Sequence, residues 1–172
     1  AEEQFITRVK IGGGEYPNME ISHLQETANE WLTPFVKNIK TADDWRKFDC
    51  LPALRNLLSW KQHRKLDEVV PKYFVTPLGR KLSIDYLGQH PSVELSMQEL
   101  FGQKSHPMIK KKPLLLTLLS PAGRPLQKTM DLQNFWKTSY IEIRKEMRGR
   151  YPKHSWPERP ENEKPTIKVK SK

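Results

Sequence analysis

The side chains that most often carry catalysis form no recognisable active-site pattern in this sequence. Its five histidines are His23, His63, His90, His106 and His154, and none has the spacing of a metal-ligand pair. The single cysteine, Cys50, can neither complete a zinc site nor form an internal disulfide. Asp43 and Asp44 are adjacent carboxylates, but they suit a helix N-terminus, where negative charge is favourable. No glycine-rich loop is followed by Lys-Ser/Thr to hold phosphates. The sequence therefore predicts no catalytic residue, no metal site and no cofactor bound within the chain.

Positive charge is the strongest chemical signal. Thirty Lys and Arg face twenty Asp and Glu, for a formal net charge of +10 and a pI of about 9.7. This balance favours a polyanionic partner such as nucleic acid. Many proteins of this size are basic without binding nucleic acid, so the charge by itself leaves both interpretations open.

The basic residues are most ordered near the C-terminus, in the stretch RKEMRGRYPKHSWPERP at 144–160. On a helix, Lys137, Arg144 and Arg148 would form a stripe able to neutralise successive phosphates. The rings of Tyr151, His154 and Trp156 could stack under unpaired bases, or the proline-flanked aromatics could fix an extended arm to the domain. The candidate nucleic-acid-binding residues are Lys137, Arg144, Lys145, Arg148, Arg150, Lys153, His154 and Trp156.

The elements that would position these residues can be assigned from periodicity. Residues 1–19 are expected to be a lead-in with a glycine-rich join, and residues 20–160 a single domain. Within that domain, residues 20–70 predict a cluster of short helices. Ser22 with Gln25, and Thr41 with Asp44, have the spacing of capping boxes that start helices.

Residues 71–130 change to a β-rich pattern. YFVTP and KLSIDY predict a hairpin, and Val93–Leu95 predicts a strand that runs into a helical turn closed by Gly102. PLLLTLLSP predicts a buried strand, and LQKTM a returning strand across the turn SPAGRP. We expect a small antiparallel sheet or a partial barrel.

Residues 131–149 predict one long amphipathic helix, with Asp131 as its N-cap and Gly149 as its left-handed C-terminal residue. Residues 150–160 form the arm, and residues 161–172 read as a disordered basic tail. The predicted fold class is α+β.

The location of the protein is constrained only by what the sequence lacks. No apolar run is long enough to span a membrane, and the N-terminus does not have the pattern of a signal peptide. With one cysteine, these features predict a cytoplasmic protein with no membrane partner. The chain begins without Met, which suggests a piece of a longer protein.

Several stretches resemble a known family. SPAGRPLQKTMDLQNFWKTSY followed by IRKEMRGRYPKHSWPERP is similar to the C-terminal region of HrpB-type ATP-dependent helicases, bacterial members of the DEAH-box group. WLTPFV, LLSWKQHRKLDEVVPKYFVTPLGRKLSIDY and MQELFG resemble the same family in the same order, so the resemblance runs from about Trp31 to Pro160.

The resemblance implies a parent enzyme that hydrolyses ATP with Mg²⁺ and remodels or unwinds RNA. Its catalytic motifs would lie in two motor domains upstream, and none of them is present here. The implied role is that of a C-terminal accessory domain that binds RNA or single-stranded nucleic acid, or positions it for the motor domains. The alternative is a docking domain that binds the motor domains or another protein without contacting RNA.

Overall fold

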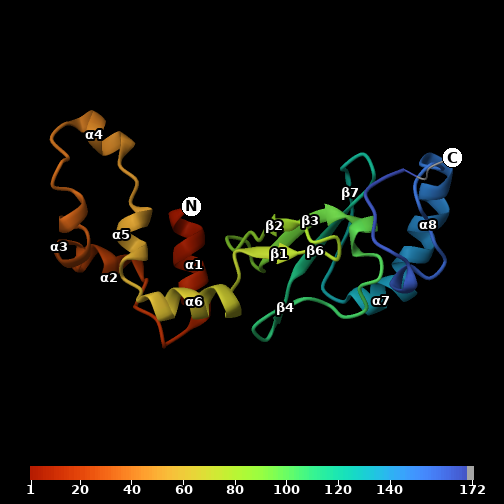
Figure 1. Ribbon diagram of the computed structural model, residues 1–172, viewed down its shortest axis with the longest axis horizontal. Coiled ribbons are helices and arrows are strands. Elements are labelled where there is room, and N and C mark those ends of the chain that lie inside the picture. The colour runs from red at the N-terminus through yellow and green to blue at the C-terminus, as the bar shows by residue number, and fades with distance from the viewer. Residues whose placement is uncertain (170–172) are drawn as a thin grey trace. The chain divides into compact units, whose positions relative to one another are not determined.

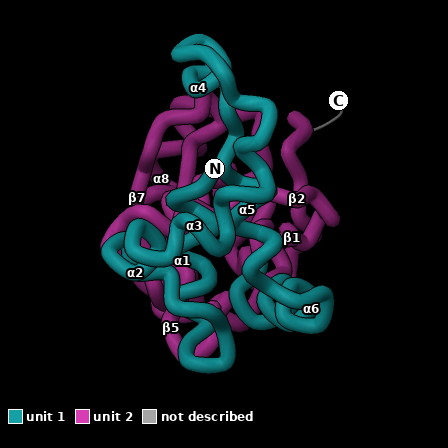
Figure 2. Tube along the Cα trace, turned by 90° about the vertical axis from the view of Figure 1, so that its left-hand side faces the viewer, with its two compact units in different colours: residues 1–71 teal, residues 72–172 magenta. Residues whose placement is uncertain are grey.

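The computed structural model describes residues 1–169, and its contacts divide the chain into two compact units. Unit 1 is Ala1–Pro71 and unit 2 is Lys72–Lys172 (Figure 2). The division falls at the proline where the sequence predicts a change from helical to β-rich structure.

Unit 1 is helical, as predicted. Its elements are α1 Glu2–Gly12, α2 Ile21–Glu26, α3 Ala28–Trp31, the 3-10 turn η1 Thr33–Phe35, α4 Ala42–Lys47, α5 Leu51–Arg55 and α6 Trp60–Val69 (Figure 1). In the segment 1–19, which the sequence predicts to be a lead-in or linker, the structure has the helix α1. Phe5 and Val9 recur at helical spacing on this helix and are both buried. Burial of this apolar face makes α1 part of the core of unit 1.

A side-chain capping box starts α4, whereas α2 begins without one. The predicted capping box of Thr41 and Asp44 is confirmed, because each side chain accepts the other residue's amide at 3.1 and 2.9 Å. Backbone hydrogen bonds from Lys40 and the cap residue also lower the pKa of Asp44. The predicted box at Ser22 does not form. The side chain of Asn18 accepts the amide of Glu20, and α2 begins directly after that residue.

A buried arginine joins the two ends of unit 1. The guanidinium of Arg8 donates from Nε to the carbonyl of Val70 at 2.9 Å and from Nη2 to Asp67 Oδ1 at 2.7 Å. The Arg8 side chain is 6% exposed, whereas that of Asp67 is 67% exposed. Because the carbonyl of Val70 is the buried partner, Arg8 mainly satisfies the C-terminal end of α6.

Unit 2 contains the strands. These are β1 Tyr73–Val75, β2 Lys81–Ser83, β3 Ser92–Ser96, β4 Met108–Ile109, β5 Lys112–Pro113, β6 Leu115–Leu119 and β7 Pro125–Thr129, with the 3-10 turn η2 Met97–Leu100 after β3. The predicted hairpin is confirmed as the antiparallel pair β1–β2. The predicted return across SPAGRP is confirmed as the antiparallel pair β6–β7, with Gly123 at a φ of 77° in the turn.

The prediction of an antiparallel sheet is wrong for one strand. In the three-stranded sheet of order β3-β6-β7, β3 pairs with β6 in parallel. Residues 97–114 lie between these strands and carry η2 and the β4–β5 hairpin, so they form the long crossover that a parallel pair requires. The strands belong to three small sheets rather than to a closed barrel.

His106 fastens the crossover to the helical end of unit 2. Its Nε2 lies 2.6 Å from the carbonyl oxygen of Leu114, and its Nδ1 accepts the amide of Leu132 at 3.1 Å. The two contacts together require a neutral ring with the proton on Nε2. Burial lowers the pKa of His106, more than its hydrogen bond to the Leu114 carbonyl raises it.

The predicted long helix is divided at Thr138 into α7 Leu132–Lys137 and α8 Ser139–Arg150. Thr138 has a φ of −121° and a ψ of −88°, and its hydroxyl donates to the carbonyl of Asn134 at 2.7 Å. A β-branched residue whose side chain hydrogen-bonds four residues back favours such a break. Asp131 caps α7 as predicted, by accepting the amide of Asn134.

The predicted helix end at Gly149 is also wrong. Gly149 lies within α8, and it is not among the glycines with positive φ in the described part of the chain. The helix is instead closed at Tyr151, whose amide donates to the carbonyl of Met147 at 2.7 Å.

The start of the predicted disordered tail is ordered. Pro160–Asn162 form a 3-10 turn, η3. The amide of Gly102 donates to the Pro160 carbonyl at 2.8 Å, and that of Thr166 donates to the Gln98 carbonyl at 3.1 Å. Residues 160–166 therefore lie against η2 and the turn after it. The last three residues of the predicted tail, 170–172, lie outside the described residues.

Candidate nucleic-acid interface

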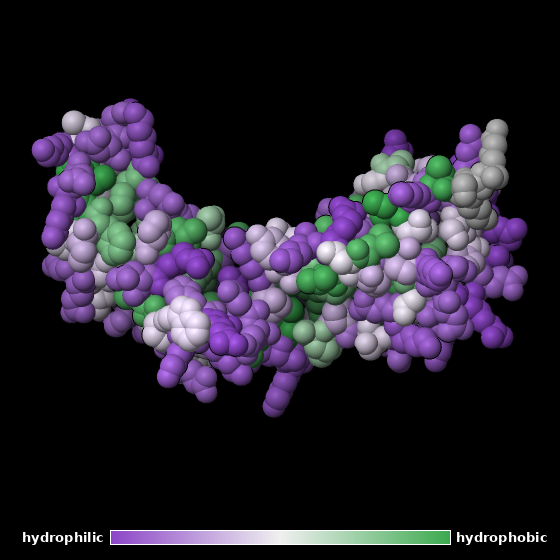
Figure 3. Space-filling model, in the orientation of Figure 1, coloured by the Kyte–Doolittle hydropathy of each residue, from purple (hydrophilic) through white to green (hydrophobic). Residues whose placement is uncertain are grey.

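The excess positive charge of the chain lies in unit 2. Residues 72–172 contain twenty Lys and Arg against nine Asp and Glu, whereas residues 1–71 contain ten against eleven. Hydrophilic residues cover most of the face shown in Figure 3, and hydrophobic residues form smaller patches on it. A polyanion would therefore be attracted to unit 2 rather than to unit 1.

The arm after α8 folds back onto that helix. The hydroxyl of Tyr140 donates to the Pro157 carbonyl at 2.6 Å, and Nε of Arg144 donates to the Trp156 carbonyl at 2.7 Å. Burial raises the pKa of Tyr140, so its hydroxyl remains a donor. The arm also closes on itself, because the indole N–H of Trp156 donates to the carbonyl of Tyr151 at 2.8 Å. Trp156 is 5% exposed. This burial favours the interpretation that the ring helps to hold the arm, and contact of Trp156 with an unpaired base stays a prediction.

The docked arm and α8 enclose a cleft of about 290 Å³ lined by Arg144, Arg148, Pro152, His154 and Trp156. Four of the eight predicted residues therefore meet in one place. We call this the basic cleft. Arg144 contributes from a partly buried position that is 20% exposed, and Arg148, one helical turn later, is exposed. Two guanidinium groups and an imidazole around one space suit a phosphate oxygen.

The other predicted residues are more dispersed. Lys145 lies 3.1 Å from Glu142, and Arg150 lies 3.4 Å from Glu146. Both are exposed pairs on α8, and such pairs are weak enough to exchange for a phosphate. Lys153 is exposed on the arm.

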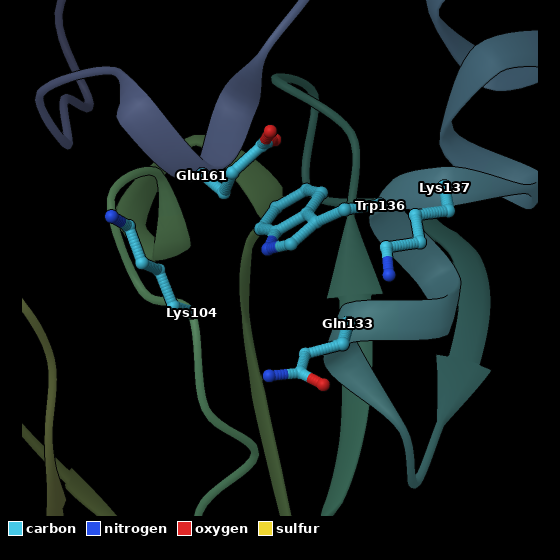
Figure 4. A pocket seen from close by; sticks show the side chains of 5 residues that line it. All are labelled: Lys104, Gln133, Trp136, Lys137 and Glu161. Carbon is cyan, nitrogen blue, oxygen red and sulfur yellow. The ribbon is translucent and has the colours of Figure 1, made fainter.

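Lys137 lies on α7, before the break, so the predicted continuous stripe with Arg144 and Arg148 is interrupted. It lines a second space of about 230 Å³, together with Lys104, Gln133, Trp136 and Glu161 (Figure 4). We call this the α7 pocket. Apart from Lys137, its residues were not predicted as a site. Trp136 reads in the sequence as part of an apolar helix face, and the other three are far apart in the chain.

Unit 1 has a different kind of surface. An apolar groove of about 360 Å³ lies among α1, α2, α3 and α5. Ile6, Leu24, Trp31 and Leu54 are among the residues that line it. We call this the apolar groove. A hydrophobic groove on a unit with little net charge suits protein contact better than phosphate contact.

Over residues 1–169, no group of three or more His, Cys, Asp or Glu side chains is arranged to hold a metal ion. Within the same range, no helix combines the length and the apolar character needed to cross a membrane.

A helical unit followed by a strongly basic α+β unit corresponds to a known class of helicase C-terminal region. The family described as ATP-dependent helicase C-terminal, of the HrpB type, matches residues 31–160, and the chain belongs to this family. The resemblance noted in the sequence is confirmed.

The chain is similar to the HrpB protein of Escherichia coli in both sequence and structure. The chain is 40% identical over 159 residues to the ATP-dependent RNA helicase HrpB of Escherichia coli K12, a match that covers 91% of this chain and 20% of that protein. The crystal structure of the E. coli DExH-box NTPase HrpB matches 95% of this chain and 21% of its own, with a TM-score of 0.90 and 38% identity. A crystal structure of the E. coli DEAH/RHA helicase HrpB matches 90% of this chain and 20% of its own, with a TM-score of 0.73 and 35% identity. The chain thus spans about a fifth of the length of these relatives.

Proposed function

We propose that unit 2 is a nucleic-acid-binding accessory module that holds single-stranded or structured RNA through its backbone phosphates. The observation that carries the proposal is the basic cleft, where Arg144, Arg148 and His154 surround one space. The net positive charge of unit 2 adds a longer-range attraction. Binding of this kind depends strongly on salt and weakly on sequence.

In the longer protein, the module would serve motor domains that lie outside this chain. ATP and Mg²⁺ would belong to those domains, which would hydrolyse the nucleotide. Unit 2 would keep the RNA close to the motor by a contact that survives while the motor releases and rebinds its substrate. The proposal is supported by the similarity of the chain to an E. coli ATP-dependent RNA helicase.

The test is the salt dependence of RNA binding by the whole chain, measured by fluorescence anisotropy with a labelled single-stranded RNA. In the test variant, Lys137, Arg148 and Lys153 are each changed to Gln. Within residues 1–169 these side chains are exposed, and none of them forms a hydrogen bond or an ion pair. Each phosphate contact on a single strand adds about 0.7 to the slope of log K against log salt. Loss of all three contacts should therefore lower the slope by about 2.

The matched control removes the same charge from unit 1, with Lys61, Arg64 and Lys65 of α6 changed to Gln. Its slope should equal that of the unchanged chain. Absence of RNA binding at low salt, or equal slopes for the two triple variants, would refute the proposal.

A second function is favoured by the apolar groove of unit 1. We propose that unit 1 docks onto the remainder of the longer protein, which makes up about four fifths of the relatives' length. Leu24→Glu would place a charge in the groove, but Leu24 is buried, so this change would also destabilise unit 1. Ile21 lies at the exposed rim of the groove, so Ile21→Glu is the better test variant. Co-purification of the separately expressed motor domains with the chain should be lost with Ile21→Glu. If the motor domains still co-purify with the Ile21→Glu chain in the same amount as with the unchanged chain, the docking role is refuted.

A further inference from the structure

The α7 pocket is built differently from the basic cleft. Trp136 contributes its indole, and Lys104, Gln133 and Lys137 surround it with flexible polar side chains that have apolar stems. Glu161 enters from the segment that follows the arm. In Figure 4 the indole lies in the middle of the group, with the amines of the two lysines on its two sides. The lining is mostly apolar in spite of these polar ends.

The indole is held rigidly. Its N–H donates to the carbonyl of Gln103 at 3.0 Å, and its ring makes an edge contact with Tyr140 at 5.4 Å between centroids. Phe135 and Phe101 pack against it at 5.3 and 6.1 Å. Trp136 is 5% exposed, so only part of the ring faces the pocket. Because the Trp136 side chain is already fixed, it loses no rotamer entropy when a flat ring packs against it.

The charges around the pocket indicate which part of a polyanion would enter it. Glu161 forms no ion pair within the described residues, and its carboxylate would repel a phosphate placed inside. It can instead accept a hydrogen bond from an amino or imino group of a base, as can the amide of Gln133. The amines of Lys104 and Lys137 are exposed and mobile enough to reach phosphates outside.

From this arrangement we infer that the α7 pocket binds an unpaired nucleobase of a single strand whose phosphates lie on Lys104 and Lys137. The inference rests on the proposed RNA-binding function and adds to it. The basic cleft would hold the backbone regardless of pairing. The α7 pocket would favour an unpaired strand over a duplex, whose bases are stacked and cannot enter.

The experiment compares two ligands that carry the same number of phosphates: a short single-stranded RNA and an oligomer of equal length without bases. A base that packs against an aromatic ring should make the RNA bind about fivefold tighter or more. In Gln133→Trp, the new indole would occupy the space of the base, and the ratio of the two affinities should fall toward one. Asn134→Trp, at the next exposed position of α7, adds the same ring elsewhere and should keep the ratio.

The outcomes are distinguishable. Equal binding of both ligands by the unchanged chain would overturn the base pocket and leave phosphate binding intact. An unchanged affinity ratio in Gln133→Trp, at an unchanged unfolding midpoint, would also overturn it. Binding of neither ligand would refute the proposed function and the pocket with it. If Gln133→Trp instead released the motor domains while RNA binding was retained, the occupant would be protein, and the inference would be wrong.

Discussion

Arg144 and Arg148 lie one turn apart on α8, line the same cleft, and should respond differently to the same substitution. The guanidinium of Arg144 donates to the Trp156 carbonyl at 2.7 Å from a position 20% exposed. A hydrogen bond with a charged donor contributes about 1.5–3 kcal/mol. The ion pair to Glu158 at 3.9 Å adds little, because Glu158 is 85% exposed. We therefore expect Arg144→Ala to lower the free energy of unfolding of unit 2 by about 2 kcal/mol.

Arg148→Ala is the variant to compare with Arg144→Ala. Arg148 is exposed and forms no ion pair or hydrogen bond in residues 1–169, so its loss should leave the unfolding midpoint unchanged. It should still lower the salt slope of RNA binding by about 0.7, the value of one phosphate contact on a single strand.

The assay pairs urea denaturation, followed by circular dichroism, with the anisotropy titration at several salt concentrations. Arg144→Ala should lower both stability and slope, and Arg144→Lys should recover part of the slope but little of the stability. If Arg144→Ala unfolds at the same urea concentration as the unchanged chain, the arm is not held by this residue. If Arg148→Ala keeps the full slope, the basic cleft does not hold phosphate.

Three further changes test the fold itself. Burial lowers the pKa of His106 from its ordinary value of 6.5, so on acidification the unfolded chain takes up the proton first. The free energy of unfolding should therefore fall as the pH drops below about 6.5, and His106→Asn, compared over the same range by thermal melts, should lose that part of the decline. Gly102→Ala should lower unfolding free energy by about 1–3 kcal/mol in urea titrations, because φ is +85° there and a Cβ would lie 2.8 Å from the carbonyl oxygen of Glu163. Arg8→Met should cost unit 1 about 1–3 kcal/mol by leaving the Val70 carbonyl buried without its donor, whereas Asp67→Asn should cost less, as the same titrations can show.

Local sequence signals predicted most elements of the fold. The Thr41 box, the Asp131 cap, the β1–β2 hairpin and the β6–β7 turn each depend on residues within a few positions of one another, and all four are present. The parallel pairing of β3 with β6 depends on the path of a long crossover, which periodicity does not encode. The break at Thr138 was missed because apolar residues continue at helical spacing through it.

The candidate site could be predicted from the sequence only where its residues lie close together in the chain. The residues of the basic cleft lie within one short stretch, so their clustering could be read from the sequence. The α7 pocket joins Lys104, Gln133 and Glu161 from three separate segments, and only tertiary structure brings them together. Arg144 was predicted to contact phosphate, and that remains a prediction. Its hydrogen bond to the arm could not be inferred, because a surface arginine and a partly buried one look alike in sequence.

The basic cleft is made jointly by a helix and by the arm that folds back on it, since Pro152, His154 and Trp156 all come from the arm. The cleft therefore exists only while the arm is docked, and any anion bound there must shift the docking equilibrium toward the closed form. Ligand affinity and arm opening are thermodynamically linked. A bound strand would slow hydrogen exchange at the amides of residues 150–157. Loss of the hydrogen bond from the Tyr140 hydroxyl to the arm would weaken anion binding, although Tyr140 does not line the cleft.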